Sequence, residues 1–149
     1  TSAPAAVKID QEPLQEQAKR YVGTLEDGTL ADPDLRLRIV ENLMDAEAHQ
    51  LTVSRITAEA KGQVKVSAAA SVLKNSMTRV AQTKAELTLE MMGNQGIGWE
   101  GEQFSEEELR SVRDWLMGKA MSIYGGSAEI QNNIISKNIL GLPETTQQG

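Results

Sequence analysis

The sequence predicts an all-α protein, an antiparallel four-helix bundle with an additional short C-terminal helix. Apolar residues recur at helical spacing over long windows, and recognisable start and stop signals bound those windows. No stretch alternates apolar and polar residues for long enough to indicate a strand. The 149 residues suffice for one core, and the plentiful alanine, leucine and glutamate favour helix.

The N-terminal part, residues 1–31, is expected to form a lead-in and a first helix. This helix should span about residues 12–25, with Pro13 in its first turn, where helices tolerate a missing N–H. Residues 26–34 are predicted to form a loop. Because the chain begins with the small-residue stretch TSAPAA rather than with Met, we expect it to be a piece of a longer protein.

The second helix is expected over residues 33–60. Asp32 and Pro33 provide an N-cap and a proline at the first helical position, and Lys61 and Gly62 provide a cation and a C′ glycine at the end. The apolar residues at helical spacing are Ile39, Leu43, Ala46, Val53, Ile56 and Ala60.

The third helix, over residues 66–92, has the clearest pattern. Its apolar positions follow alternating steps of four and three, which predicts a seam that packs against other helices, and Lys84 is the one interruption. The loop GNQGIG, residues 93–98, ends it. The seam consists of Val66, Ala70, Leu73, Met77, Val80, Leu87 and Met91.

The fourth helix opens with a capping box, in which Ser105 is the N-cap and Glu108 its partner. Phe104 and Leu109 are placed for a hydrophobic staple, and the helix should run to about Ser122.

Two adjacent glycines, Gly125 and Gly126, separate this helix from a fifth over residues 127–140. Gly141 and Pro143 follow as stop signals. Residues 32–143 are thus expected to form the helical bundle, followed by a polar tail, residues 144–149.

Composition argues against several classes of function. The net charge of −6 disfavours a nucleic-acid surface, and the absence of cysteine removes disulfides, thiolate chemistry and Cys-based metal sites. No apolar run approaches a membrane span, and residues 1–10 lack the apolar region of a signal peptide, so a cytoplasmic protein is expected. The single histidine, His49, is more readily a polar position on a helix face than a catalytic or metal-binding residue.

The two glycine loops are the candidate functional features. In YGGSAEIQ, glycines permit close backbone approach, and the free N–H groups of the following helix form an anion site to which Ser127 adds a hydroxyl. A phosphate or pyrophosphate would suit this place. The alternative is a plain interhelical turn with Ser127 as N-cap, and GNQGIG leaves the same two alternatives open.

Residues 32–143 resemble the C-terminal helical domain of acyl-CoA dehydrogenases, flavoenzymes that desaturate acyl thioesters. The likeness is strongest in IYGGSAEIQNNIISKNILGLP, residues 123–143, which is similar to the family's long closing signature. EMMGNQGIG is similar to the family's Gln-x-x-Gly-Gly-x-Gly loop, and Asp32 and Pro33 with the long second helix match a third pattern.

The resemblance implies an FAD site, an acyl-CoA substrate, an electron-transfer flavoprotein as acceptor, and homo- or hetero-oligomers, dimers or tetramers, formed through these bundles. Gly126 would lie beside the substrate, and the loop after the third helix would meet FAD across a subunit boundary. The implied FAD contacts are Glu90, Met91, Met92, Gly93, Asn94, Ser127, Ala128 and Glu129.

The sequence departs from the family at three points. Many members carry the catalytic glutamate, which takes the α-proton while a β-hydrogen passes as hydride to the flavin, where this chain has Gly125. Glu90 stands in place of the family's glutamine, and residues 1–31 contain no Arg-x-x-Phe-Gly motif. The fragment alone is therefore expected to be inactive, with the base upstream or on a partner subunit.

Two alternatives of other classes remain at this point. One is a non-catalytic assembly subunit or domain of a hetero-oligomeric acyl-CoA dehydrogenase, in which no base is needed. The other is a helical binding module without flavin, in which the glycine loops are plain turns.

Overall fold

The computed structural model describes residues 12–60 and 66–143. Within these ranges the chain forms five α-helices and no strand, only an isolated bridge between Thr24 and Leu30. None of these helices is long and apolar enough to cross a membrane. The elements are α1 (Leu14–Val22), α2 (Pro33–Ala60), α3 (Val66–Met92), the 3₁₀ turn η1 (Gly93–Ile97), α4 (Glu106–Gly118), the 3₁₀ turn η2 (Lys119–Ser122) and α5 (Ala128–Asn138). The all-α fold class is confirmed.

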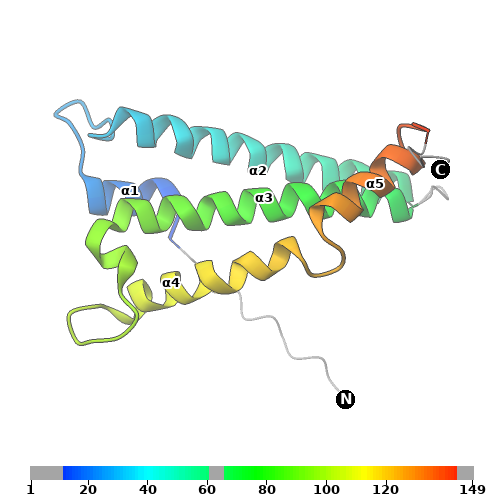
Figure 1. Cartoon of the computed structure of the whole chain (residues 1–149). Helices are drawn as coiled ribbons and strands as arrows, with labels where there is room; N and C mark the ends of the chain where they lie inside the picture. The colour runs from blue at the N-terminus through cyan, green and yellow to red at the C-terminus, as the bar shows by residue number, and fades with distance from the viewer. Residues whose placement is uncertain (1–11, 61–65, 144–149) are drawn as a thin grey trace, which may run out of the picture.

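Helix α3 is the common partner of the other helices. It packs against α1, α2, α4 and α5, and in Figure 1 it lies between α2 on one side and α4 on the other. Both α2 and α4 run antiparallel to α3, and α5 crosses the end of α3 at which that helix begins (Figure 1). Contact with α3 therefore sets the position of residues on α5, and the end of α3 sets the position of the segment that follows it.

The predicted start signals form as expected. An Asp32 carboxylate oxygen accepts the N–H of Leu35 at 2.9 Å, so the second helix is capped where the sequence indicates. In the capping box, the N–H of Glu108 donates to Ser105 Oγ at 3.2 Å and the N–H of Ser105 donates to Glu108 Oε2 at 2.8 Å. Both capping predictions are confirmed.

Three helices differ in extent from the expectation, the fifth among them, because α5 ends at Asn138 and not near residue 140. The first helix is shorter than residues 12–25, because Gly23 at φ +84° closes it and Pro13 precedes the helix instead of lying in its first turn. The fourth helix reaches Ser122 only through η2. The predicted stop at Lys61 and Gly62 lies outside the described residues.

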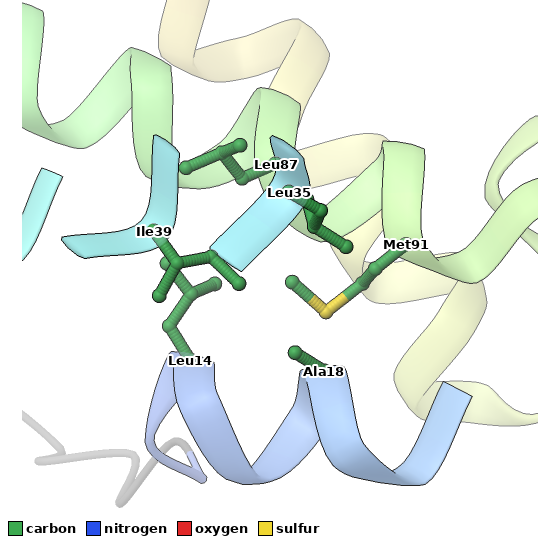
Figure 2. Packing of buried hydrophobic residues seen from close by; sticks show 6 residues of the cluster. All are labelled: Leu14, Ala18, Leu35, Ile39, Leu87 and Met91. Atoms are coloured by element: carbon green, nitrogen blue, oxygen red, sulfur yellow. The ribbon is translucent and has the colours of Figure 1, made fainter. Parts of the chain in front are cut away.

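The main hydrophobic cluster lies where α1 meets the start of α2 and the end of α3. Figure 2 shows its side chains pointing toward one another from these three helices. Leu87, on α3, is 1% exposed. The cluster consists of Leu14, Ala18, Leu35, Ile39, Leu87 and Met91.

Further along, polar contacts join α2 and α3. Asn42 Nδ2 donates to the Val80 carbonyl at 3.1 Å, and Arg79 pairs with Asp45 at 2.6 Å. A hydrogen bond of 2.7 Å joins His49 Nδ1 and Ser76 Oγ, which gives the lone histidine a partner on the neighbouring helix.

The predicted seam of α3 is therefore only partly a core. Leu87 and Met91 are buried, but Met77 is 45% exposed, and Leu43, one of the apolar positions predicted on the second helix, is also exposed. Ser71 and Thr78 are buried instead. The seven-residue pattern identified the helix correctly, but the half near its start turns partly toward solvent.

Leu87→Ala should lower the free energy of unfolding by about 2–5 kcal/mol, because it leaves a cavity in the cluster that joins three helices. Leu25→Ala, at an exposed loop position, is the control and should cost well under half as much. Urea denaturation of the two variants measures the difference. Equal losses would show that this cluster is not the centre of stability.

Candidate functional site

The glycine pair lies in the turn between η2 and α5. Gly125 and Gly126 have φ of +68° and +98°, in the left-handed region that favours glycine. The N–H of Gly126 donates to the Ile123 carbonyl at 3.2 Å. A Cβ at Gly126 would lie 2.9 Å from Gln131 Nε2, whereas at Gly125 it would meet nothing within 4 Å. Gly126 therefore suits the turn through its positive φ, and a side chain there would also displace the Gln131 amide.

Both glycine carbonyls are bound by side chains from outside the turn. Gln131 Nε2, on α5, donates to the Gly125 carbonyl at 2.5 Å. Lys74 Nζ, on α3, donates to the Gly126 carbonyl at 2.7 Å. The first N–H groups of a helix have no partner within it, so the start of α5 can offer backbone donors to a ligand.

Ser127 occupies the N-cap position of α5 by its backbone angles, but its side chain makes no capping hydrogen bond. The alternative in which Ser127 is the N-cap is thus correct for the backbone angles of Ser127. It is wrong for the side chain, which does not cap the helix. The hydroxyl lies close enough to the Glu129 carboxylate that its interaction is the main cause that lowers the Glu129 pKa. The Glu129 N–H and the charge of Lys74 lower that pKa further.

The second predicted segment, Glu90 to Asn94, begins with a paired carboxylate. Arg38, on α2, donates to both Glu90 oxygens, at 2.5 and 2.6 Å. This hydrogen bonding raises the pKa of the Arg38 guanidinium. With side chains 39% and 49% exposed, the pair contributes little stability, but it neutralises the charge of Glu90.

The other residues of that segment differ in what they can offer a ligand. Met91 and Met92 are each 5% exposed, so their side chains offer a ligand almost no surface. Gly93, at φ +56°, and Asn94 are exposed. A ligand at this segment would therefore contact the Gly93 turn and the Asn94 side chain before any methionine.

The structure does not bring the two predicted segments together within one chain. The glycine turn is bound at Lys74 and the second segment begins at Glu90, so they lie roughly 24 Å apart along α3. The expectation that this segment meets a cofactor across a subunit boundary remains a prediction.

Sequence reasoning missed the three residues that organise these segments, Lys74, Gln131 and Arg38. Gln131 belongs to the recognised SEIQ-like motif, here SAEIQ, so that motif was an available signal. Lys74 and Arg38 reach partners on other helices, and no local pattern indicates such a contact.

A groove of about 560 Å³ lies between α3 and α4 and extends to Glu12 before α1. Lys84, the interruption in the predicted seam, lines it together with Arg110 and Asp114. Trp115 lies at its wall, and the buried Trp115 Nε1 has no hydrogen-bond partner among the described residues. The described residues contain no cluster of three or more His, Asp or Glu that could hold a metal.

The sequence matches the family described as acyl-CoA dehydrogenase, C-terminal domain, over residues 11–140. The chain belongs to this family.

Two curated relatives carry the name acyl-CoA dehydrogenase IpdE1. The protein from Mycolicibacterium smegmatis is 32% identical over 131 residues, which cover 87% of this chain and 29% of the relative. The protein from Mycobacterium tuberculosis is 41% identical over 58 residues, 39% of this chain and 14% of the relative. The chain thus spans less than a third of the length of these relatives.

A solved structure, the ChsE4–ChsE5 complex from Mycobacterium tuberculosis, has the same fold. The match has a TM-score of 0.69 with 22% identity, and it covers 89% of this chain and 34% of the matched chain. The family match and the relatives confirm the resemblance to acyl-CoA dehydrogenases, and the solved structure shows the same fold.

Glu129 should titrate below the ordinary glutamate pKa of 4.5, and Ser127→Ala should raise its pKa toward that value by removing the principal hydrogen bond. Since the folded pKa is the lower one, the associated stabilisation is present above the unfolded pKa and is lost as the pH falls through the folded pKa. Carboxyl ¹³C NMR measures the titration. Ser111→Ala is the control, because its hydroxyl binds the Glu107 carbonyl and lies on another helix. An unchanged Glu129 pKa in Ser127→Ala would contradict the assigned cause.

Proposed function

We propose that this chain is the C-terminal domain of an FAD-dependent acyl-CoA dehydrogenase that catalyses α,β-desaturation of an acyl-CoA thioester. The observation that carries the proposal is the Gly125–Gly126 turn, whose carbonyls are bound by Lys74 and Gln131 directly before the start of α5. Family membership and the two relatives named acyl-CoA dehydrogenase support it. The domain's part is to supply cofactor contacts and an oligomer interface.

The residues at the start of α5 fit a flavin cofactor. A helix N-terminus with free N–H groups suits the electron-rich groups of FAD, and Ser127, Ala128 and Glu129 would make those contacts. Gly126, with no side chain, would lie beside the acyl thioester. The second contact, the Glu90–Asn94 segment, carries no unpaired charge, because Arg38 binds Glu90. When bound, FAD would supply the centre that accepts hydride.

The catalytic base is not in this turn. Gly125 has no side chain, and Glu129, the nearest carboxylate in the sequence, has a lowered pKa that makes it a weaker proton acceptor. We place the base in the part of the enzyme that precedes this chain or in a partner subunit.

The groove along α3 and α4 supports the proposal that this is one domain of a longer enzyme. The groove is lined in part by the apolar residues Ala81, Ala85, Trp115 and Met121, which a covering segment would shield from water. The groove also carries charges of both signs, from Lys84, Arg110 and Asp114, which suit a polar helix or loop.

The outer face of α2 supports assembly with another subunit. Apolar side chains follow it at steps of three, four and seven residues, and Met44 and Leu51 are 66% and 62% exposed. The fold neighbour is itself a two-component complex. We propose a homo- or hetero-oligomer, dimer or tetramer, in the cytoplasm, with electron-transfer flavoprotein as acceptor. The apolar residues of this α2 face are Leu37, Val40, Met44 and Leu51.

A non-catalytic assembly subunit is the second candidate. The glycine at position 125 and the exposed α2 face both favour it, since such a subunit needs an interface and no base. The third candidate from sequence, a helical binding module without flavin, has no observation in its favour beyond the plain backbone geometry of the turns.

The 149-residue chain should neither retain FAD nor oxidise acyl-CoA, whereas the full-length protein that carries this domain should do both. In that protein, Glu129→Gln should weaken FAD binding about tenfold by losing a charge-assisted hydrogen bond, with little change in flavin reduction at saturating FAD. Glu102→Gln, in the exposed loop before α4, is the matched control.

Flavin fluorescence titration and single-turnover reduction by acyl-CoA measure the two effects. If Glu129→Gln abolishes reduction while FAD stays bound, Glu129 is the base and its proposed role is wrong. If the wild-type full-length protein binds FAD but cannot reduce it, the assembly-subunit candidate replaces the enzyme.

Leu51→Glu should reduce the oligomer mass of the protein, because it puts a charge in the exposed apolar face of α2. Leu25→Glu, at a similarly exposed loop position, should leave the mass unchanged. Light scattering after size-exclusion chromatography at high protein concentration distinguishes the two. A wild-type protein that remains strictly monomeric would count against the proposed interface.

A further inference from the structure

Lys74, a partly buried lysine of the central helix α3, makes one specific contact. Its ammonium donates to the Gly126 carbonyl at 2.7 Å, across the contact between α3 and α5. The Glu129 carboxylate lies close enough for the Lys74 charge to influence its pKa, yet the hydrogen bond goes to the backbone. A cation that binds a carbonyl when a carboxylate is nearby fixes the backbone more than it balances charge.

The turn needs such a contact because its own sequence does not hold it. Two adjacent glycines have the widest choice of backbone conformation of any dipeptide, and ordering each residue is entropically costly. The described contacts that fix the turn are few: the Gly126 N–H to Ile123, Gln131 to Gly125, and Lys74 to Gly126. Lys74 is the only one of these three contacts that comes from outside the segment 123–131.

A second hydrogen bond between α3 and α5 fixes the position of α5 on α3 independently of Lys74. Asn75 Nδ2, beside Lys74 on α3, donates to Asn132 Oδ1 on α5 at 2.9 Å. This bond orients α5 on α3 but does not touch the turn. The effects of the two bonds can therefore be separated. The Asn75–Asn132 bond acts on helix α5, and the Lys74–Gly126 bond acts on the glycine turn.

We propose that Lys74 is a positioning residue, which holds the Gly126 carbonyl toward α3 and thereby sets the Gly125–Gly126 turn and the start of α5 in the arrangement that receives the flavin and thioester. This deepens the proposed function and rests on it. Removal of Lys74 frees the turn to rotate its carbonyls toward the ligand face, where an electron-rich ligand would be repelled.

The first test uses the 149-residue chain without any ligand. Lys74→Met, which keeps length but removes charge and donor, should accelerate amide hydrogen exchange in residues 125–129 about tenfold, with α2 and α4 unchanged. Lys74→Arg, which keeps a cationic donor, should restore most of the protection. Lys84→Met removes the same charge from the same helix and should leave residues 125–129 as in the wild type.

Two outcomes of this test overturn the positioning role. One is unchanged exchange in residues 125–129 in Lys74→Met. The other is equal acceleration throughout α2, α4 and α5, which would show that Lys74 contributes only to overall stability. Asn75→Ala provides a further comparison, because it should loosen α5 with a smaller effect on the turn.

The second test uses the full-length protein with FAD. Lys74→Met should weaken FAD binding about tenfold and shift the visible flavin spectrum, with Lys74→Arg close to wild type. Faster exchange with unchanged FAD affinity and spectrum would overturn the link between the turn and the flavin. If the wild-type full-length protein binds no FAD, the proposed function fails, and the exchange result still decides whether Lys74 holds the turn.

Discussion

Every other helix of the described chain takes its place from contact with α3. Helices α1, α2, α4 and α5 all pack on it, and both predicted ligand-facing segments are attached to it, one through Lys74 and one as its direct continuation at Gly93. A single long helix with partners on several sides makes both apolar and polar contacts. It does so by dividing its length: Leu87 and Met91 belong to the hydrophobic cluster, while the earlier half makes polar contacts.

This division explains why an apolar pattern alone could not describe the packing. Hydrophobic spacing locates a helix and its approximate inward face, and it did so for Pro33–Ala60 and Val66–Met92. It does not reveal that Asn42 would be buried against a carbonyl of α3, or that Met77 would be exposed. Such outcomes depend on which residues of another helix lie opposite, and those residues are tens of positions away in the sequence.

Local signals were the most predictive. Asp32 before Pro33, and Ser105 three residues before Glu108, act within one helical turn, so the sequence alone determines them. The glycine turn was recognised by motif, and its positive φ angles agree with the use of glycine there. What could not be predicted was how the turn is held, since the donor to Gly126 comes from another helix. The Ser127 side chain also makes no capping hydrogen bond, although its residue type suits a cap.

The continuity of α3 between its two functional ends limits which insertions and deletions the domain can accept. Between Lys74 and Glu90 the chain is helical throughout, so one added residue would rotate one end by about 100° relative to the other and move it by about 1.5 Å. Either the contact to Gly126 or the pair with Arg38 would then be lost. Length variation among natural homologues should therefore be absent from this stretch and concentrated in the exposed loop before Ser105, which connects to α3 through η1 and has no such double attachment.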